Sequence, residues 1–93
     1  MTNTFHLRVL AVDRAFYEGD AVSLSLSIQD GRLGLMANHS PMVAAVVPGE
    51  LHFQPPEGAP VYAQSGSGLL RFERNEALLL LDSIGDPETP ATA

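Results

Sequence analysis

Three residue types are missing from this 93-residue chain: cysteine, tryptophan and lysine. Without cysteine the chain can form no disulfide, and it offers no thiolate nucleophile and no cysteine-ligated metal site. All five of its cationic side chains are therefore arginines, and its formal net charge is −6. This acidic balance disfavours non-specific binding of nucleic acid, which depends on neutralising phosphates, and it also disfavours anchoring to anionic lipid.

Long apolar runs are also missing. The longest are residues 42–47 and 77–81, whereas a membrane-spanning helix needs roughly 20 apolar residues. The first ten residues, MTNTFHLRVL, carry neither a basic leader nor an apolar core followed by small residues. We therefore expect no direct membrane insertion, no secretory signal and a mature N-terminus.

Short alternating segments dominate what is present. At 45% apolar residues the chain can bury one core, and 93 residues leave no room for a second. Apolar residues alternate with serines over residues 21–28, which is the pattern of a half-buried strand. The other main strand candidates are residues 5–12, 33–36, 42–47, 51–54, 61–64, 70–73 and 77–82. About nine or ten short strands are expected in all, which predicts an all-β sandwich or small barrel.

Turn signals separate these strands. Asp30-Gly31 between two apolar runs is a strong hairpin signal, because glycine tolerates positive φ. The stretch PPEGAP at residues 55–60 predicts a solvent-facing hairpin loop, since its prolines cannot sit inside a strand. The apolar run at residues 77–82 is predicted to be a strand buried on both faces. The stretch GDPETPATA, residues 85–93, has no apolar face to bury and is predicted to be disordered.

No motif for catalysis or cofactor binding is found. A phosphate-binding P-loop needs a lysine, which the chain lacks. The stretch SGSGL at residues 65–69 lacks the third glycine of a dinucleotide loop. The pattern G-x-S-x-G cannot be fitted around Ser65 or Ser67, which argues against a serine hydrolase. We therefore expect no catalytic residue and no cofactor.

The three histidines, His6, His39 and His52, lie on separate predicted elements. None has a carboxylate at metal-ligand spacing, and Asp30-Gly31 lacks the repeated acidic residues of a calcium loop. We expect no metal site and interpret His6 and His52 as exposed strand histidines. By elimination, the sequence favours a binding or structural module over an enzyme.

One stretch, GRLGLMANHSP at residues 31–41, closely resembles the pattern G-x-x-G-I-x-x-x-H-x-P of the epsilon subunit of bacterial F-type ATP synthases. Downstream, VVPGEL is similar to the A-x-x-P-G-x-L turn of that family. Further matching segments are residues 5–7, 16–22, 66–70 and 80–83. Together these motifs occur in the family's order and spacing, and they cover about residues 4–84.

The resemblance implies a flattened sandwich of two five-stranded sheets over residues 1–84 and a flexible tail at residues 85–93. It also implies a non-catalytic rotor subunit of the central stalk, which holds the gamma subunit and rests on the c-ring to couple ion translocation to ATP synthesis or hydrolysis. Such a subunit is peripheral to the bacterial cell membrane, on its cytoplasmic side. The alternative is a free-standing β-sandwich binding module without a synthase role.

Carried over position by position, the resemblance implies two groups of partner-binding residues. The c-ring end comprises Gln29, Asp30, Gly31, Arg32, Leu33, His39, Pro41 and Met42. The face toward gamma comprises Ala11, His39, Val43 and Ala44. A tight turn suits such a role, because it holds a few polar side chains beyond the end of a rigid sandwich. His39 is accordingly interpreted as an interface residue.

Three features depart from the family pattern. Arg32 stands where many relatives have an acidic residue, which should weaken pairing with basic c-ring loops unless the partner loop has changed too. Ser67 replaces a glycine at the sandwich corner and predicts ordinary backbone angles there. The helical hairpin that follows the sandwich in typical bacterial members does not occur in this sequence, so we expect no hairpin-mediated inhibition of ATP hydrolysis by it.

Overall fold

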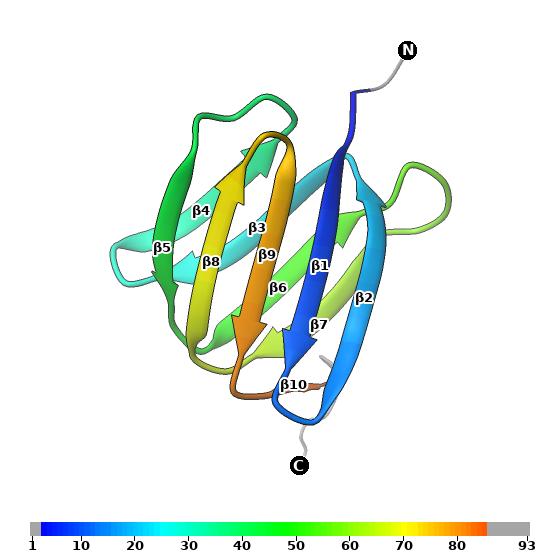
Figure 1. The fold of residues 1–93 in the computed structure, drawn as a ribbon. Coiled ribbons are helices and arrows are strands. Elements are labelled where there is room, and N and C mark those ends of the chain that lie inside the picture. Colours follow the sequence, from blue (N-terminus) through cyan, green and yellow to red (C-terminus); the bar gives the residue numbers. More distant parts are fainter. Residues whose placement is uncertain (1–2, 86–93) are drawn as a thin grey trace.

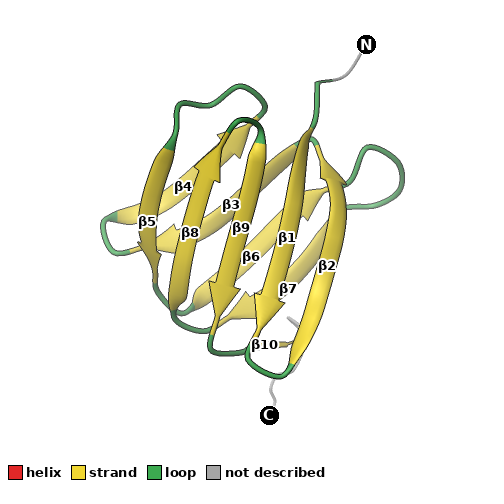
Figure 2. Cartoon of the chain, viewed as in Figure 1, coloured by secondary structure: helices red, strands yellow, loops and turns green. Residues whose placement is uncertain are grey.

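The computed structural model describes residues 3–85. These residues form ten β-strands joined by turns and loops (Figures 1 and 2). No helix that could cross a membrane occurs in these residues. The strands are β1 (Phe5–Ala11), β2 (Arg14–Ala21), β3 (Ser23–Ile28), β4 (Gly31–Met36), β5 (Met42–Val46), β6 (Gly49–Gln54), β7 (Val61–Ser65), β8 (Gly68–Glu73), β9 (Glu76–Leu81) and β10 (Ile84–Gly85).

The strands form two layers of five that lie one in front of the other (Figure 1). The back layer has the order β4-β3-β6-β7-β10, and the front layer has the order β5-β8-β9-β1-β2. A single antiparallel bridge between Ile28 of β3 and Val46 of β5 joins the layers along one side. Within the front layer, β1 and β9 pair in parallel. The predicted all-β sandwich of two five-stranded sheets is confirmed.

The core lies between the two layers because each strand turns alternate side chains inward. In β3, Leu24 and Leu26 are fully buried, whereas the serines beside them are partly exposed. Phe5 of β1 packs edge-to-face on Phe72 of β8, with the ring centroids 5.5 Å apart. The predicted alternation of residues 21–28 is therefore confirmed, and it accounts for β3, an inner strand of the back layer between β4 and β6.

The prediction for residues 77–82 is wrong in one respect. Ala77, Leu79 and Leu81 of β9 are buried, but Leu78 is half-buried and Leu80 is 44% exposed. β9 lies between β8 and β1 in the middle of its sheet, yet only one face of that sheet is covered by the other layer. An apolar run that looked buried on both faces thus leaves an apolar outer side.

The corner between β7 and β8 is tightly packed. A Cβ on Gly68 would fall on the carbonyl oxygen of Leu80, so no larger residue fits there without a backbone shift. Ser67 is absent from the positive-φ residues, which confirms its predicted ordinary backbone. In the predicted PPEGAP loop, the Gln54 side-chain amide donates to the Gly58 carbonyl at 3.0 Å. The predicted tail lies outside the described residues apart from Gly85, which pairs with Gln64 in β7.

Candidate partner-binding surfaces

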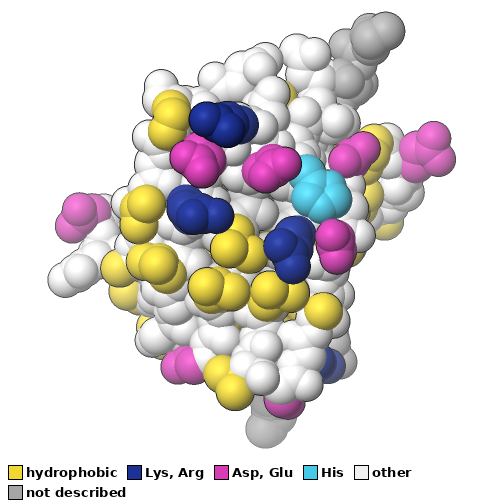
Figure 3. All heavy atoms as spheres, in the orientation of Figure 1, with side chains coloured by type: hydrophobic (Ala, Val, Ile, Leu, Met, Phe, Trp, Pro, Cys, Tyr) yellow, Lys and Arg dark blue, Asp and Glu magenta, His cyan; other side chains and the backbone are white. Residues whose placement is uncertain are grey.

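A row of exposed apolar side chains crosses the outer face of the front layer. The strand register places Ala45 opposite Leu69, Leu69 opposite Leu80, and Leu80 beside Leu10. Leu69 is 46% exposed and Leu80 44% exposed. Figure 3 shows hydrophobic side chains forming a band across this face. We call Ala45, Leu69, Leu80 and Leu10 the leucine row; a contiguous apolar patch of this kind is typical of an interaction surface.

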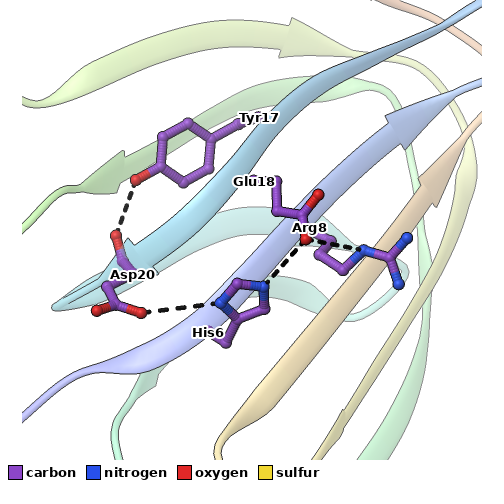
Figure 4. Close-up of polar contacts among 5 residues, drawn as sticks. All are labelled: His6, Arg8, Tyr17, Glu18 and Asp20. Carbon is purple, nitrogen blue, oxygen red and sulfur yellow. Dashed lines mark hydrogen bonds and ion pairs between the residues drawn. The ribbon is translucent and has the colours of Figure 1, made fainter.

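A charged band borders the leucine row on the same face (Figure 3). His6 Nε2 lies 3.4 Å from Glu18 Oε2, and His6 Nδ1 lies 3.8 Å from Asp20 Oδ1. Arg8 Nε lies 3.8 Å from the same Glu18 oxygen (Figure 4). These side chains are 40–59% exposed, so each ion pair contributes little to stability. The band is a solvated polar border, and His6 lies on the exposed side of its strand as predicted.

A shallow hollow of about 280 Å³ lies within this charged band. Its lining residues are His6, Arg8, Glu18, Arg71, Glu73, Glu76, Ala77 and Leu78. Among residues 3–85, however, no group of three or more histidine and carboxylate side chains is arranged to hold a metal ion. The hollow is therefore lined by charged side chains of both signs.

The β3–β4 hairpin forms a second candidate surface. Ile28 pairs with Gly31, so the loop consists of Gln29 and Asp30 alone, and Gly31 has a φ of 130°. The predicted tight turn is therefore confirmed. A hollow of about 320 Å³ separates this hairpin tip from β5, and its lining residues are Ile28, Gln29, Asp30, Met42, Val43, Ala44 and Ala45.

The loop that carries His39 lies at the other end of β4. The His39 N–H donates to the Met36 carbonyl at 3.3 Å, and the His39 ring packs on Phe72 with centroids 6.0 Å apart. In Figure 1 this loop connects the upper ends of β4 and β5, whereas the hairpin tip lies at the opposite end of β4. His39 is therefore separated from Gln29 and Asp30 by the length of a strand.

Arg32 does not extend away from the hairpin tip. Its guanidinium group donates to Ser27 Oγ at 3.0 Å, to Ser25 Oγ at 2.8 Å and to the Glu50 carbonyl at 2.5 Å. These acceptors belong to β3, which is next to β4, and to β6, which lies on the far side of β3 in the back layer. Arg32 thus ties three strands of its own sheet together.

Comparison with known proteins decides the family. The family model described as "ATP synthase, Delta/Epsilon chain, beta-sandwich domain" matches residues 4–86. The chain belongs to this ATP synthase delta/epsilon family. The ATP synthase epsilon chain of Clostridium novyi is 30% identical over 88 residues, which cover 95% of this chain and 67% of the relative. The ATP synthase epsilon chain of Caldicellulosiruptor bescii is 34% identical over 84 residues, which cover 90% of this chain and 61% of the relative.

The epsilon-type fold recurs in two solved ATP synthase structures. A chain of the Euglena gracilis mitochondrial ATP synthase, in a structure of OSCP, F1 and c-ring, has a TM-score of 0.87 and 14% identity. It is matched over 95% of this chain and 56% of its own length. A chain of the Tetrahymena thermophila mitochondrial ATP synthase, in a structure of the central stalk and c-ring, has a TM-score of 0.82 and 8% identity. The match covers 95% of this chain and 70% of that chain. At these identities the likeness shows a shared β-sandwich.

The chain covers only part of its epsilon relatives. It spans 67%, 61% and 57% of the length of the relatives from Clostridium novyi, Caldicellulosiruptor bescii and Dichelobacter nodosus. The family model matches residues 4–86, and the positions predicted to bind partners all lie within this range. The activity and partners of a whole epsilon chain are therefore matters for a proposal.

The structure brings some of the epsilon-derived positions together and separates others. Gln29, Asp30 and Met42 line one hollow with Val43 and Ala44, although the first three were assigned to the c-ring end and the last two to the gamma face. Two other predicted positions lie away from this hollow. His39 is at the far end of β4, and Ala11 is at the end of β1, where it pairs with Arg14.

Reasoning from the sequence missed the leucine row. Its members come from four strands that are distant in the chain, and only the register of the sheet aligns them. The sequence did contain one signal for it, the run of four leucines at residues 78–81. A strand with one buried face needs an apolar residue only at every second position, so this run places leucines on the outer face as well. An apolar residue on the outward side of such a run marks either a covered sheet or an interface.

Proposed function

We propose that this chain is a non-catalytic central-stalk subunit of an ATP synthase, peripheral to the cytoplasmic side of a bacterial cell membrane. In this role it binds the gamma subunit and the c-ring, and it couples ion translocation to ATP synthesis or hydrolysis without forming or breaking a bond itself. Membership of the epsilon family supports the proposal, because the relatives are ATP synthase epsilon chains.

The observation that carries the proposal is the leucine row. Leu69 and Leu80 are nearly half exposed, and they lie on strands that are hydrogen-bonded on both sides. Such strands hold their backbone rigidly, so this chain loses little conformational freedom when a partner covers the row. A gamma subunit that docks there would bury apolar surface at the centre and meet the charged band at the rim, which is the usual composition of a stable interface.

The c-ring contact belongs at the hairpin tip in this proposal. Gln29 and Asp30 are exposed, and Figure 1 shows the β3–β4 turn extending past β5 at the side of the sandwich. Met42 lines the hollow next to the tip. Arg32, in contrast, is engaged by Ser25 and Ser27. We therefore assign the direct contact to Gln29 and Asp30, and to Arg32 the support of the hairpin that carries them.

A binding measurement with the cognate gamma subunit tests this function. The purified chain and gamma, mixed at near-physiological salt, should elute as one stoichiometric complex in size-exclusion chromatography. Leu80→Glu should disrupt the complex, because it places a charge in the middle of the leucine row. Tyr62→Glu is the matched control, since Tyr62 is 47% exposed but lies on β7 in the other layer.

Two results would count against the proposal. If the unmodified chain does not bind gamma under these conditions, a free-standing binding module becomes the better interpretation. If Leu80→Glu binds as well as Tyr62→Glu, gamma does not use the leucine row, and the chosen face is wrong.

A further inference from the structure

The strand β5 has an open edge. On one side it pairs with β8 along its whole length, from Met42 opposite Phe72 to Val46 opposite Gly68. On the other side only its end is occupied, where Val46 bridges to Ile28 and the Val47 N–H donates to the Ser27 carbonyl at 3.1 Å. Among residues 3–85, no strand pairs with the outer side of residues 42–45. We call residues 42–45 the open edge.

The direction of the backbone groups on the open edge follows from this end contact. Backbone N–H and C=O groups point to alternate sides of a strand from one residue to the next. Because the Val47 N–H points away from β8 and toward β3, those of Ala45 and Val43 point to the same outer side. The groups of Ala44 and Met42 are directed toward β8 instead. The open edge thus presents the N–H groups of Val43 and Ala45 to another strand.

The other sheet edges are protected against strand addition, and β5 is not. Charged side chains, irregular pairing and very short strands are the usual protections. The edge strand β2 carries Glu18 and Asp20, and its register with β1 shifts between Val9 and Leu10. The edge strand β10 has two residues, and β4 contains Arg32 between two glycines. The strand β5, with the sequence MVAAV, contains no charge, proline or glycine.

The surroundings of the open edge define the chemistry of an added strand. On its outer face the edge continues the leucine row, through Ala45 and the 63% exposed Val43. On the side of the hairpin tip, the hollow of about 320 Å³ contains the carboxylate of Asp30 and no cationic side chain. An added strand would therefore carry apolar side chains outward and a lysine or arginine toward Asp30. A second copy of this chain fits poorly, because each copy has a net charge of −6 and would bring a second Asp30.

We propose that the open edge of β5 binds an extended apolar and basic segment of the partner that covers the leucine row, by adding a sixth strand to the front layer. Backbone hydrogen bonds to Val43 and Ala45 hold this segment, and alternate side chains set its orientation. The inference rests on the proposed function, in which that partner is the gamma subunit. It states how gamma is bound, namely by main-chain pairing in addition to side-chain packing.

The test removes one backbone donor. Ala45→Pro deletes the outward N–H of Ala45, and proline is tolerated on an edge strand where the N–H does not serve the ladder. Ala45→Val is the control, since it keeps the N–H and enlarges the side chain. Titration of purified gamma into each variant, followed by calorimetry, should show about tenfold weaker binding for Ala45→Pro than for Ala45→Val. Circular dichroism and thermal melting establish that both variants are folded.

Hydrogen exchange of the unmodified chain provides a readout that does not depend on the proline variant folding. The amides of Val43 and Ala45 should exchange rapidly in the free chain and become protected when gamma binds. If gamma binds but these amides stay unprotected, and if the two variants bind equally, the strand-addition proposal is overturned while the proposed function stands. If gamma does not bind the unmodified chain at all, both are overturned.

Discussion

Asn38 and Asn75 hold each other through two hydrogen bonds that join the loop after β4 to the turn between β8 and β9. The Asn38 N–H donates to Asn75 Oδ1 at 2.6 Å, and Asn75 Nδ2 donates to Asn38 Oδ1 at 3.0 Å. Asn75 has a φ of 57° and its neighbour Arg74 a φ of 52°, which is the mark of a type I′ turn. This asparagine pair therefore fixes the His39 loop against the end of the opposite layer.

Replacing Asn75 should destabilise the sandwich in a graded way. Asn75→Ala removes both side-chain hydrogen bonds and places a Cβ residue at positive φ without asparagine's tolerance for it, so the free energy of unfolding should fall by about 2 kcal/mol. Asn75→Gly loses the same hydrogen bonds, but glycine adopts the positive φ without strain. The free energy of unfolding should therefore fall by only about 1 kcal/mol. Urea denaturation measures both values. Equal losses in the two variants would show that the positive φ is not a source of the effect.

Arg32 is expected to matter for stability before it matters for a partner. Arg32→Ala should lower the free energy of unfolding by about 0.5–1 kcal/mol, because the three acceptors it serves are only partly shielded from water. Arg32→Lys should recover little of this loss, since an ammonium cannot reproduce the planar guanidinium fork.

Arg71→Ala is the matched control for Arg32, because Arg71 is exposed and has no hydrogen bond or ion pair with any described side chain. Guanidinium chloride denaturation of the three variants makes the comparison. If Arg71→Ala costs as much as Arg32→Ala, the contacts of Arg32 with Ser25 and Ser27 do not stabilise the sheet.

Gly68 should be intolerant of any side chain. The Cβ of Gly68→Ala would collide with the Leu80 carbonyl, and relieving the clash requires β8 or β9 to shift, at a cost of about 2–3 kcal/mol. Gly34→Ala is the control, because no neighbouring heavy atom lies within 4 Å of the Cβ position at Gly34. The free energy of unfolding of this variant should change by no more than about 0.5 kcal/mol. Thermal unfolding measures the difference. Similar midpoints for the two variants would mean that the β7–β8 corner is looser than its geometry indicates.

Two adjacent leucines of β9 should respond very differently to truncation. Leu79→Ala creates a cavity between the layers and should cost about 2–4 kcal/mol, because Leu79 is fully buried. Leu80→Ala removes an outward side chain and should cost less than about 1 kcal/mol in the isolated chain. The free energy of unfolding in urea distinguishes the two. A large cost at Leu80 would mean that the outer face of β9 is covered in solution by a further contact.

Much of this fold is readable from local patterns. The serine alternation in β3, the Asp30-Gly31 hairpin and the proline-rich loop at residues 55–60 were all predicted, since each depends on a few neighbouring residues. The family pattern in residues 31–41 was equally informative, because several residue types recur in it at fixed spacing. Interpretation of β9 was wrong because a run of leucines does not tell whether one or both faces of a strand are covered.

Local sequence determined that the chain forms short strands with tight turns, and that it belongs to the ATP synthase delta/epsilon family. Only the tertiary structure decided which strands are neighbours. The parallel pairing of β1 with β9 aligns Leu10 with Leu80, although these residues are far apart in the chain. The tertiary structure also separates His39 from the hairpin tip and directs Arg32 toward its own sheet. It leaves β5 with an open edge. Each of these features depends on contacts between distant segments, and alternation along a single strand carries no information about them.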